Sequence, residues 1–380
     1  MKFADIPFHE EAKRRLRDMV DSGHIPHALL LEGPSGSGKF SLARAYARYV
    51  HCTDRTPEGD SCGKCPSCLQ HDSFNHIDTF FSFPVLKKSG KTTISEDYMP
   101  EFRELLAESP FMDFSIWLEK LGNVNGQPAM YVEEVAELVN RMNLTPRQSK
   151  YKIVIIWLAE RMREEAANKL LKLLEEPHSD TLFILTSDSP ADILPTIYSR
   201  TQRIPVRRYS DSEAAQILST QFGVDENASV IAASLAEGDI NMALSSLSSD
   251  KTSGEYLELF MSLMRLSWMR KVAELRAWSN DVASLGREGS ARFYEYCARM
   301  IRENFIMNLG EPQLNSLSKA EESFSVKFSP FINSANVLDI FKVLTEARND
   351  TLMNGNGKII AFDLAVKMIL LIKRATDPAK

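Results

Sequence analysis

The stretch from Gly33 to Lys39 constrains the fold of this chain more than any other, because it follows the pattern G-x-x-x-x-G-K. An apolar run at 28–31 precedes it, as in a strand buried on both faces, and a helical pattern follows at 40–50. In this setting backbone N–H groups can surround a phosphate at a helix N-terminus. We therefore expect an α/β nucleotide-binding domain that can contact ATP or ADP. The expected contacts are Gly33, Pro34, Gly36, Ser37, Gly38 and Lys39.

The first half of the chain continues as alternating strand and helix patterns. Further strands are expected at 79–83, 151–156 and 181–186, and helices at 9–22, 98–121, 132–142 and 164–176. Such alternation predicts a parallel sheet with crossover helices. Beyond 210 only helical periodicity remains, which predicts a small helical domain at 210–250 and a larger one at 255–375.

The residues that handle Mg²⁺ in phosphoryl transfer are missing. Phe40 occupies the position where a Ser or Thr normally binds the metal. The strand that should end in an acidic pair ends instead in Trp157 and Leu158. Because a positioned metal supplies much of the catalysis, we expect Mg²⁺ binding to be weak or absent and hydrolysis to be very slow or nil. The competing hypothesis is an ATPase in which Ser41 and Glu160 take over, although Ser41 is turned by about 100° along the helix.

Four of the five cysteines crowd together, at Cys52, Cys62, Cys65 and Cys68. In a chain without an export signal, this clustering favours a metal over disulfides. The C-x-x-C turns, with Gly63 and Pro66 in them, suit structural zinc held by four thiolates. A site with His51 or His71 in place of one cysteine remains an alternative.

The composition is that of an ordinary globular protein, with 44% hydrophobic and 25% charged residues. A net charge of −6 argues against a protein that coats nucleic acid, although a local basic patch can still contact phosphates. The apolar stretch at 359–372 is too short for a membrane span and is interrupted by Asp363 and Lys367. We expect a soluble, cytoplasmic protein with no membrane partner.

Three motifs give the chain a specific resemblance to a known family. Residues 166–177 read AANKLLKLLEEP and resemble the A-N-x-L-L-K-x-L-E-E-P-P helix of bacterial clamp-loader subunits. Residues 194–201, LPTIYSRT, are similar to the family's L-x-T-I-x-S-R-C segment. The cysteine order, one Cys followed by C-x-x-C-x-x-C, resembles the zinc module inserted in the AAA+ clamp-loader subunits of the delta-prime and gamma/tau types.

The resemblance covers the whole chain and implies its domain organisation. It implies an AAA+ core at 1–208, a helical lid at 209–252 and a helical collar for oligomerisation at 253–380. The core would contain the zinc module at about 52–70 and an insertion at about 86–125. The resulting fold class is an α/β AAA+ core followed by all-α lid and collar domains.

Departures from the gamma/tau motor favour the delta-prime type. Phe40 and Trp157 replace the metal ligand and the acidic pair of the motor. In addition, Asn241 stands where the motor's phosphate-sensing arginine belongs. The delta-prime type hydrolyses nothing and lends an arginine to a neighbour. The resemblance therefore implies that Arg200, with Ser199, acts in trans on the γ-phosphate of an adjacent subunit. We expect the nearby Arg203, Arg207 and Arg208 to form a solvated basic face or to contact phosphates.

The resemblance also implies partners. These are the gamma/tau and delta clamp-loader subunits, the sliding clamp and primer-template DNA, within a DNA polymerase III holoenzyme. The main alternative is a gamma/tau-like ATPase. A different class of protein, a stand-alone zinc-containing nucleotide or nucleic-acid binder, would be a monomer in solution.

Overall fold

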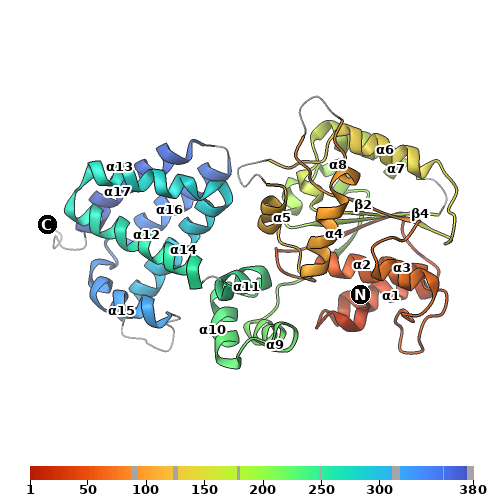
Figure 1. Cartoon of the computed structure of the whole chain (residues 1–380), viewed down its shortest axis with the longest axis horizontal. Coiled ribbons are helices and arrows are strands. Elements are labelled where there is room, and N and C mark those ends of the chain that lie inside the picture. Colours follow the sequence, from red (N-terminus) through yellow and green to blue (C-terminus); the bar gives the residue numbers. More distant parts are fainter. Residues whose placement is uncertain are drawn as a thin grey trace. The chain divides into compact units, whose positions relative to one another are not determined.

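The computed structural model describes residues 1–87, 92–122, 127–177, 180–248, 250–309, 317–353 and 355–374. The chain forms two compact units, Met1–Leu244 and Ser245–Lys380 (Figure 1). Residues 209–244 therefore belong to the first unit. The boundaries expected at 208 and 252 remain predictions.

The first unit is built on a five-stranded parallel sheet. Its strands are β1 (Ala28–Glu32), β2 (Thr79–Ser82), β3 (Lys152–Ile156), β4 (Thr181–Ser187) and β5 (Gln202–Pro205). They lie in the order β2-β3-β4-β1-β5, and every neighbouring pair is parallel. This confirms the predicted parallel sheet with crossover helices. The sequence did not predict β5, because Ile204 is its only buried residue.

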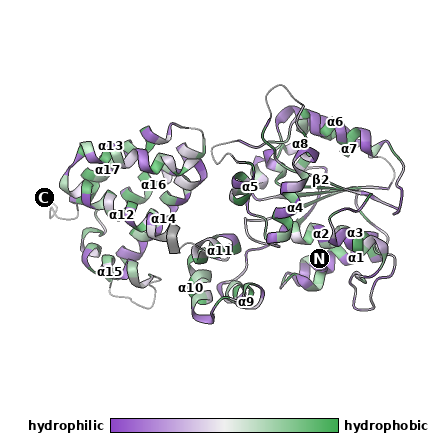
Figure 2. Ribbon diagram, viewed as in Figure 1, coloured by the Kyte–Doolittle hydropathy of each residue, from purple (hydrophilic) through white to green (hydrophobic). Residues whose placement is uncertain are grey.

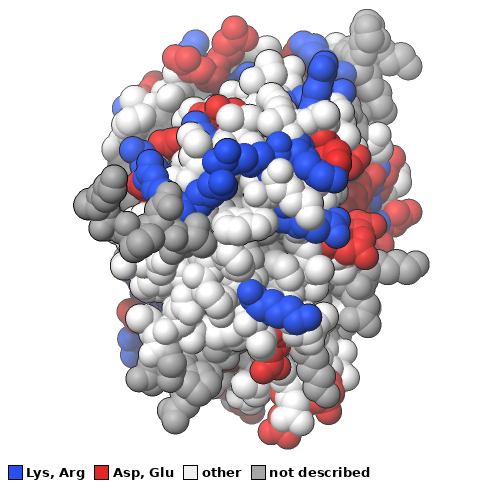
Figure 3. Space-filling model, turned by 90° about the vertical axis from the view of Figure 1, so that its left-hand side faces the viewer, with Lys and Arg blue, Asp and Glu red and all other residues white. Residues whose placement is uncertain are grey.

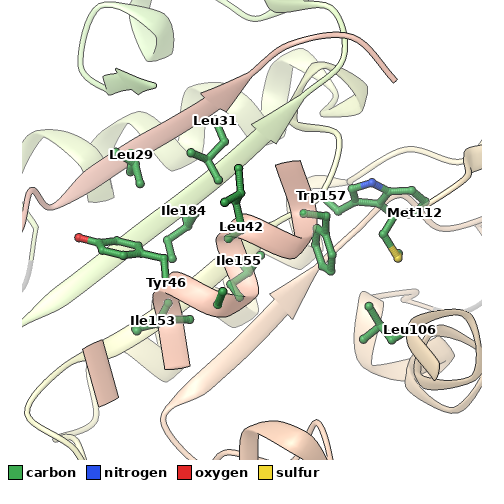
Figure 4. Close-up of a cluster of buried hydrophobic side chains, with 14 of the residues drawn as sticks. Leu29, Leu31, Leu42, Tyr46, Leu106, Met112, Ile153, Ile155, Trp157 and Ile184 are labelled. Carbon is green, nitrogen blue, oxygen red and sulfur yellow. The ribbon is translucent and has the colours of Figure 1, made fainter. Parts of the chain in front are cut away.

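The central strands are apolar on both faces because helices cover both sides of the sheet. Side chains alternate between the two faces along a strand. Leu29 and Leu31 therefore join one core cluster, whereas Leu30 joins the cluster on the opposite face. On the first face Leu42 and Tyr46 of the helix that follows β1 point towards the sheet (Figure 4).

Besides short 3-10 helices, eleven α-helices accompany this sheet in the residues that the structure describes. They are α1 (Glu10–Asp21), α2 (Lys39–His51), α3 (Pro66–Asp72), α4 (Met99–Glu108), α5 (Phe114–Lys120), α6 (Val132–Met142), α7 (Glu164–Glu175), α8 (Pro195–Tyr198), α9 (Asp211–Phe222), α10 (Glu226–Ala236) and α11 (Ile240–Ser248). The helical pattern expected around 98–121 forms two helices, α4 and α5. Pro110 explains the break, since it donates no hydrogen bond and disfavours helical backbone at Ser109.

The predicted insertion at 86–125 is described in part. Residues 88–91 and 123–126 lie outside the described residues. The remainder contributes α4 and α5, whose rings Phe102 and Trp117 pack against each other and against Trp157. Trp117 of α5 is fully buried and donates from Nε1 to the carbonyl of Pro84 at 2.7 Å. This part of the insertion is therefore integral to the core.

The second unit is helical throughout its described residues, as the sequence predicted. Its helices are α12 (Asp250–Met269), α13 (Val272–Ser284), α14 (Gly286–Leu309), α15 (Lys319–Phe328), α16 (Val337–Leu352) and α17 (Gly357–Arg374). Apolar and polar residues occupy different sides of these helices (Figure 2), and Phe260, Phe293 and Leu364 lie in the common core. Among the described helices, none has the length and apolar character that a membrane span requires.

Figure 3 shows the face at the left-hand side of Figure 1, which belongs to the second unit. Lys and Arg side chains form a band across it, although the chain as a whole has a net charge of −6. A local basic surface of the kind that the sequence left open is therefore present on this unit.

Candidate nucleotide loop, metal centre and arginine

The residues predicted to contact phosphates form a curled loop between β1 and α2. Gly36 and Gly38 have φ values of +68° and +78°, in the left-handed region that glycine adopts at little cost. Ser37 is buried and donates from Oγ to the carbonyl of Pro34 at 2.8 Å. The carbonyl of Ser37 accepts a 2.9 Å hydrogen bond from Nε2 of His9. The strand, glycine-rich turn and helix are thus arranged as predicted.

Lys39, which was expected to reach the terminal phosphates, is paired within the chain. Its side chain is 5% exposed, and Nζ lies 2.8 Å from Oδ1 of Asp188. It also donates to the carbonyl of Pro34 and to Oγ of Ser37. Asp188 directly follows β4, which pairs with β1 and brings the two loops together. A phosphate at this loop would have to compete with a carboxylate for the ammonium group.

Other residues of the first unit close the loop further. A Cβ atom at Gly36 would lie 2.1 Å from Oδ1 of Asp239, and one at Gly38 would lie 2.9 Å from the hydroxyl of Tyr209. The Asp239 carboxylate caps α11 by accepting from the backbone N–H groups of Asn241 and Met242, and burial raises its pKa. The pocket beside the loop has a volume of about 20 Å³, room for a water molecule. Ligand pockets typically have roughly 300 Å³ or more.

Phe40 is a core residue. It is 4% exposed, and its ring centroid lies 6.0–6.3 Å from those of Phe81, Phe102 and Trp157. Phe102 belongs to α4, so part of the insertion packs where a metal-binding hydroxyl would face the site. The position therefore serves packing.

The two residues that could replace the missing metal ligand and base have other partners. The hydroxyl of Ser41 donates to the carbonyl of Pro110. Oε1 of Glu160 accepts a 3.0 Å hydrogen bond from the backbone of Asp188, and burial, with the Asp188 charge adding to it, raises the pKa of Glu160. Asn241 is likewise buried, and its amide donates to the carbonyl of Met112 at 3.0 Å. These contacts do not favour the ATPase hypothesis.

The four clustered cysteines converge. Cys52 directly follows α2, and Cys65 and Cys68 lie at the start of α3. The four sulfur atoms all lie within 4.8 Å of one another. The sulfurs of Cys62 and Cys68 are 3.9 Å apart, close to the ~3.8 Å that tetrahedral zinc with Zn–S bonds of about 2.3 Å requires. Backbone N–H groups of Lys64 and Cys65 donate to the Cys62 sulfur and lower the pKa of this thiol, whereas burial raises the pKa of Cys52 and Cys68. This cluster could bind a metal ion.

The histidines form a separate group. His51, His71 and His76 pack against one another, and Nδ1 of His51 lies 3.0 Å from Nε2 of His71. The rings of His51 and His76 stack at 4.2 Å with 22° between their planes. Ring nitrogens bind metals in the plane of the ring, so stacked rings direct their lone pairs away from a common point. Burial lowers the pKa of His51 to about 3 and that of His76 to about 4, which leaves both rings neutral.

Arg200 follows α8 and is exposed, with 37% of its side chain accessible. Its Nη2 lies 2.7 Å from Oε1 of Glu175, the last residue of α7, and its Nη1 donates to the carbonyl of Thr196 at 3.0 Å. The hydroxyl of Ser199 donates to the same carbonyl at 3.1 Å. The predicted arginine is therefore accessible to a partner molecule and already oriented.

The neighbouring arginines are engaged differently. Arg203 contacts the Tyr198 ring and its hydroxyl, and Arg207 forms a two-point ion pair with Glu213. Arg208 donates to the carbonyl of Glu237 at 3.2 Å. All three remain on the surface, as expected of a solvated basic face.

Three acidic residues of these sites were not predicted, namely Asp188, Asp239 and the Arg200 partner Glu175. Asp188 carried a usable signal, because a polar residue at the carboxyl end of a buried parallel strand commonly faces a ligand site. Asp239 accepts from backbone groups two and three residues along the chain, as a residue before a helix commonly does. Glu175 pairs with Arg200 from another element, and nothing in its local sequence reveals that partner.

A phosphate loop after β1 of a sheet in this order, followed by the helices α9–α11, defines an AAA+ core. Residues 8–210, more than half of the chain, match the family model described as DNA polymerase III, delta subunit, so the chain belongs to this family of clamp-loader subunits.

Individual relatives agree with this family. A delta' subunit of Pseudomonas aeruginosa is 34% identical over 46% of this chain and 41% of its own length. The delta' subunit of Haemophilus influenzae is 28% identical over 67% of this chain and 64% of its own length. The gamma/tau subunit of Mycobacterium tuberculosis is 29% identical over 54% of this chain and 28% of its own length. Each match spans less than two thirds of the relative's length. A gamma subunit-related protein of Thermotoga maritima has 14% identity and a TM-score of 0.42, covering 95% of this chain and 99% of its own, too loose a likeness to support an argument.

Proposed function

We propose that this chain is a delta-prime-type clamp-loader subunit that does not hydrolyse ATP and supplies Arg200 to the ATP site of a neighbouring subunit. The single observation that carries the proposal is the contrast between two cations. Both contact a carboxylate, but the Lys39 side chain is 5% exposed with three acceptors around its ammonium group, whereas the Arg200 side chain is 37% exposed. A chain so arranged can donate a cation to a partner's phosphate more readily than it can bind a phosphate itself.

Packing around the phosphate loop supports the absence of turnover. Phe40 and Trp157 occupy the positions of the metal ligand and of the acidic pair, and both are buried in the core. In this proposal the loop is retained as architecture, and ATP or ADP binds weakly if at all.

The proposed partners are the gamma/tau and delta subunits, the sliding clamp and primer-template DNA. The collar at 253–380 would assemble the ring, the lid at 209–252 would link it to the core at 1–208, and the basic band of the second unit could contact DNA phosphates. We further propose that Cys52, Cys62, Cys65 and Cys68 hold a structural zinc ion. Four protein ligands leave no open position for catalysis.

The test reconstitutes the loader from this chain and its cognate gamma/tau and delta subunits. We expect Arg200→Ala to lower ATP turnover on the order of 10³-fold, as expected of an arginine that stabilises transition-state charge. Arg203→Ala is the matched control, because Arg203 is an exposed arginine three residues away that faces Tyr198. It should leave turnover within about twofold of the unmodified loader, since its guanidinium contacts the ring and hydroxyl of Tyr198.

Two results would overturn the proposal. One is unchanged turnover in the Arg200→Ala loader. The other is robust ATP hydrolysis by the isolated chain that Lys39→Ala abolishes. In the second case a fall in turnover on Glu160→Gln would favour the gamma/tau-like ATPase.

A further inference from the structure

Glu175 stands at an electrostatically unfavourable place. It is the last residue of α7, where the helix dipole disfavours a negative charge. An arginine from another element compensates, because Nη2 of Arg200 lies 2.7 Å from Oε1 of Glu175. The adjacent Glu176 is also exposed and has no ion pair with a described residue. The Arg200 contact thus gives the carboxylate at 175 a specific role.

The contacts of Arg200 orient its guanidinium but use only some of its N–H donors. Arginine carries five N–H donors in a rigid plane. Glu175 takes one through Nη2, and the carbonyl of Thr196 takes another through Nη1. Two acceptors from different elements fix both the position and the plane of the group. The other donors remain available on a side chain that is 37% exposed.

We propose that Glu175 is a positioning residue for Arg200, holding its guanidinium ready for a phosphate bound in the neighbouring subunit. The inference rests on the proposed function, because it assumes that Arg200 acts in trans. A guanidinium oriented in advance loses less conformational freedom when it meets the developing charge. Removing the carboxylate should therefore slow the chemical step and leave the folding of this chain almost unchanged, since exposed ion pairs contribute little to stability.

The test compares Glu175→Gln with Glu176→Gln in the reconstituted loader. Both variants remove one exposed carboxylate from the end of α7, but only the first removes the partner of Arg200. We expect Glu175→Gln to lower kcat for ATP about fivefold, which corresponds to the free energy that a well-formed exposed ion pair contributes. KM for ATP, assembly with the other subunits and the thermal midpoint should stay unchanged. Glu176→Gln should match the unmodified loader.

A double-mutant cycle separates positioning from a structural effect. On an Arg200→Ala background, Glu175→Gln should cause no further loss, because a residue that acts only through Arg200 has nothing left to position. A further fall in kcat on that background would overturn the inference, as would equal behaviour of Glu175→Gln and Glu176→Gln. If Arg200→Ala itself leaves turnover unchanged, the proposed function fails first. A large Arg200 effect with no Glu175 effect refutes the positioning role alone.

Discussion

Replacing Phe40 by serine completes the G-x-x-x-x-G-K-[ST] pattern and tests what this position does. In a hydrolysing protein the new hydroxyl would restore a metal ligand. Here Phe40 fills space between α2, β2 and α4, with three aromatic rings about it. We expect the substitution to cost stability and to give no hydrolysis.

The magnitude follows from burial. Phe40 is 4% exposed, and truncation of a buried phenylalanine costs about 3–5 kcal/mol. A serine hydroxyl left without a partner in the same apolar site adds roughly 1–3 kcal/mol. The free energy of unfolding of the Phe40→Ser protein should therefore fall by at least about 3 kcal/mol. Phe40→Leu retains most of the apolar volume and should cost clearly less.

Urea unfolding followed by tryptophan fluorescence measures this loss, because Trp117 and Trp157 report on the unit that contains Phe40, and Trp268→Phe with Trp278→Phe removes the signal of the second unit. ATP turnover of folded Phe40→Ser with Mg²⁺ should stay at background, because Lys39 remains paired with Asp188 and no carboxylate replaces Trp157. A loss of stability below about 1 kcal/mol would refute the packing role. The appearance of Mg²⁺-dependent ATP turnover would refute the conclusion that the phosphate-loop site cannot hydrolyse ATP.

Three further predictions concern the loop, the cysteines and pH. Asp188→Asn should release Lys39 and tighten ATP or ADP binding, measured by titration with a fluorescent nucleotide; unchanged affinity would show that the ion pair does not close the site. Cys65→Ser should abolish stoichiometric zinc in elemental analysis and lower the thermal midpoint, whereas the buried Cys297→Ser should keep its zinc, and equal zinc in both would exclude the proposed centre. Burial, opposed by a backbone hydrogen bond, lowers the pKa of His9 to about 4, so stability present above pH 6.5 should be lost as the pH falls towards 4. In urea titrations His9→Gln should flatten this slope by up to ~1.4 kcal/mol per pH unit, and an unaltered slope would contradict the assignment.

Local patterns were sufficient to predict the central strands and the phosphate loop. The run at 28–31 is apolar at every position because both faces of β1 are covered, and such a run is visible without any partner. The edge strand β5 buries Ile204 alone, which leaves no pattern to detect. Pro110 is itself a signal for the break between α4 and α5, but the apolar helical patterns on both sides of it made the break hard to recognise.

The ion pairs at the candidate sites could not be predicted from local sequence patterns. Lys39 meets Asp188 because β4 lies beside β1 in the sheet, and strand order is a property of the whole fold. Arg200 meets Glu175 because the end of α7 lies against the segment after α8. Three of the cysteines, by contrast, were predictable because C-x-x-C spacing places the sulfurs of Cys62, Cys65 and Cys68 close together, whereas Cys52 was added because the clustering and the family resemblance include it.

Packing explains why glycines persist in a loop whose lysine is already paired. A Cβ atom at Gly33 would lie 2.0 Å from the carbonyl of Val206, and one at Gly36 would lie 2.1 Å from the Asp239 side chain and 2.7 Å from the backbone nitrogen of Ile240. These distances leave no room for a side chain even when no phosphate is present. The loop glycines are therefore required by the fold of the first unit itself, and the G-x-x-x-x-G-K pattern in this chain does not by itself indicate ATP turnover.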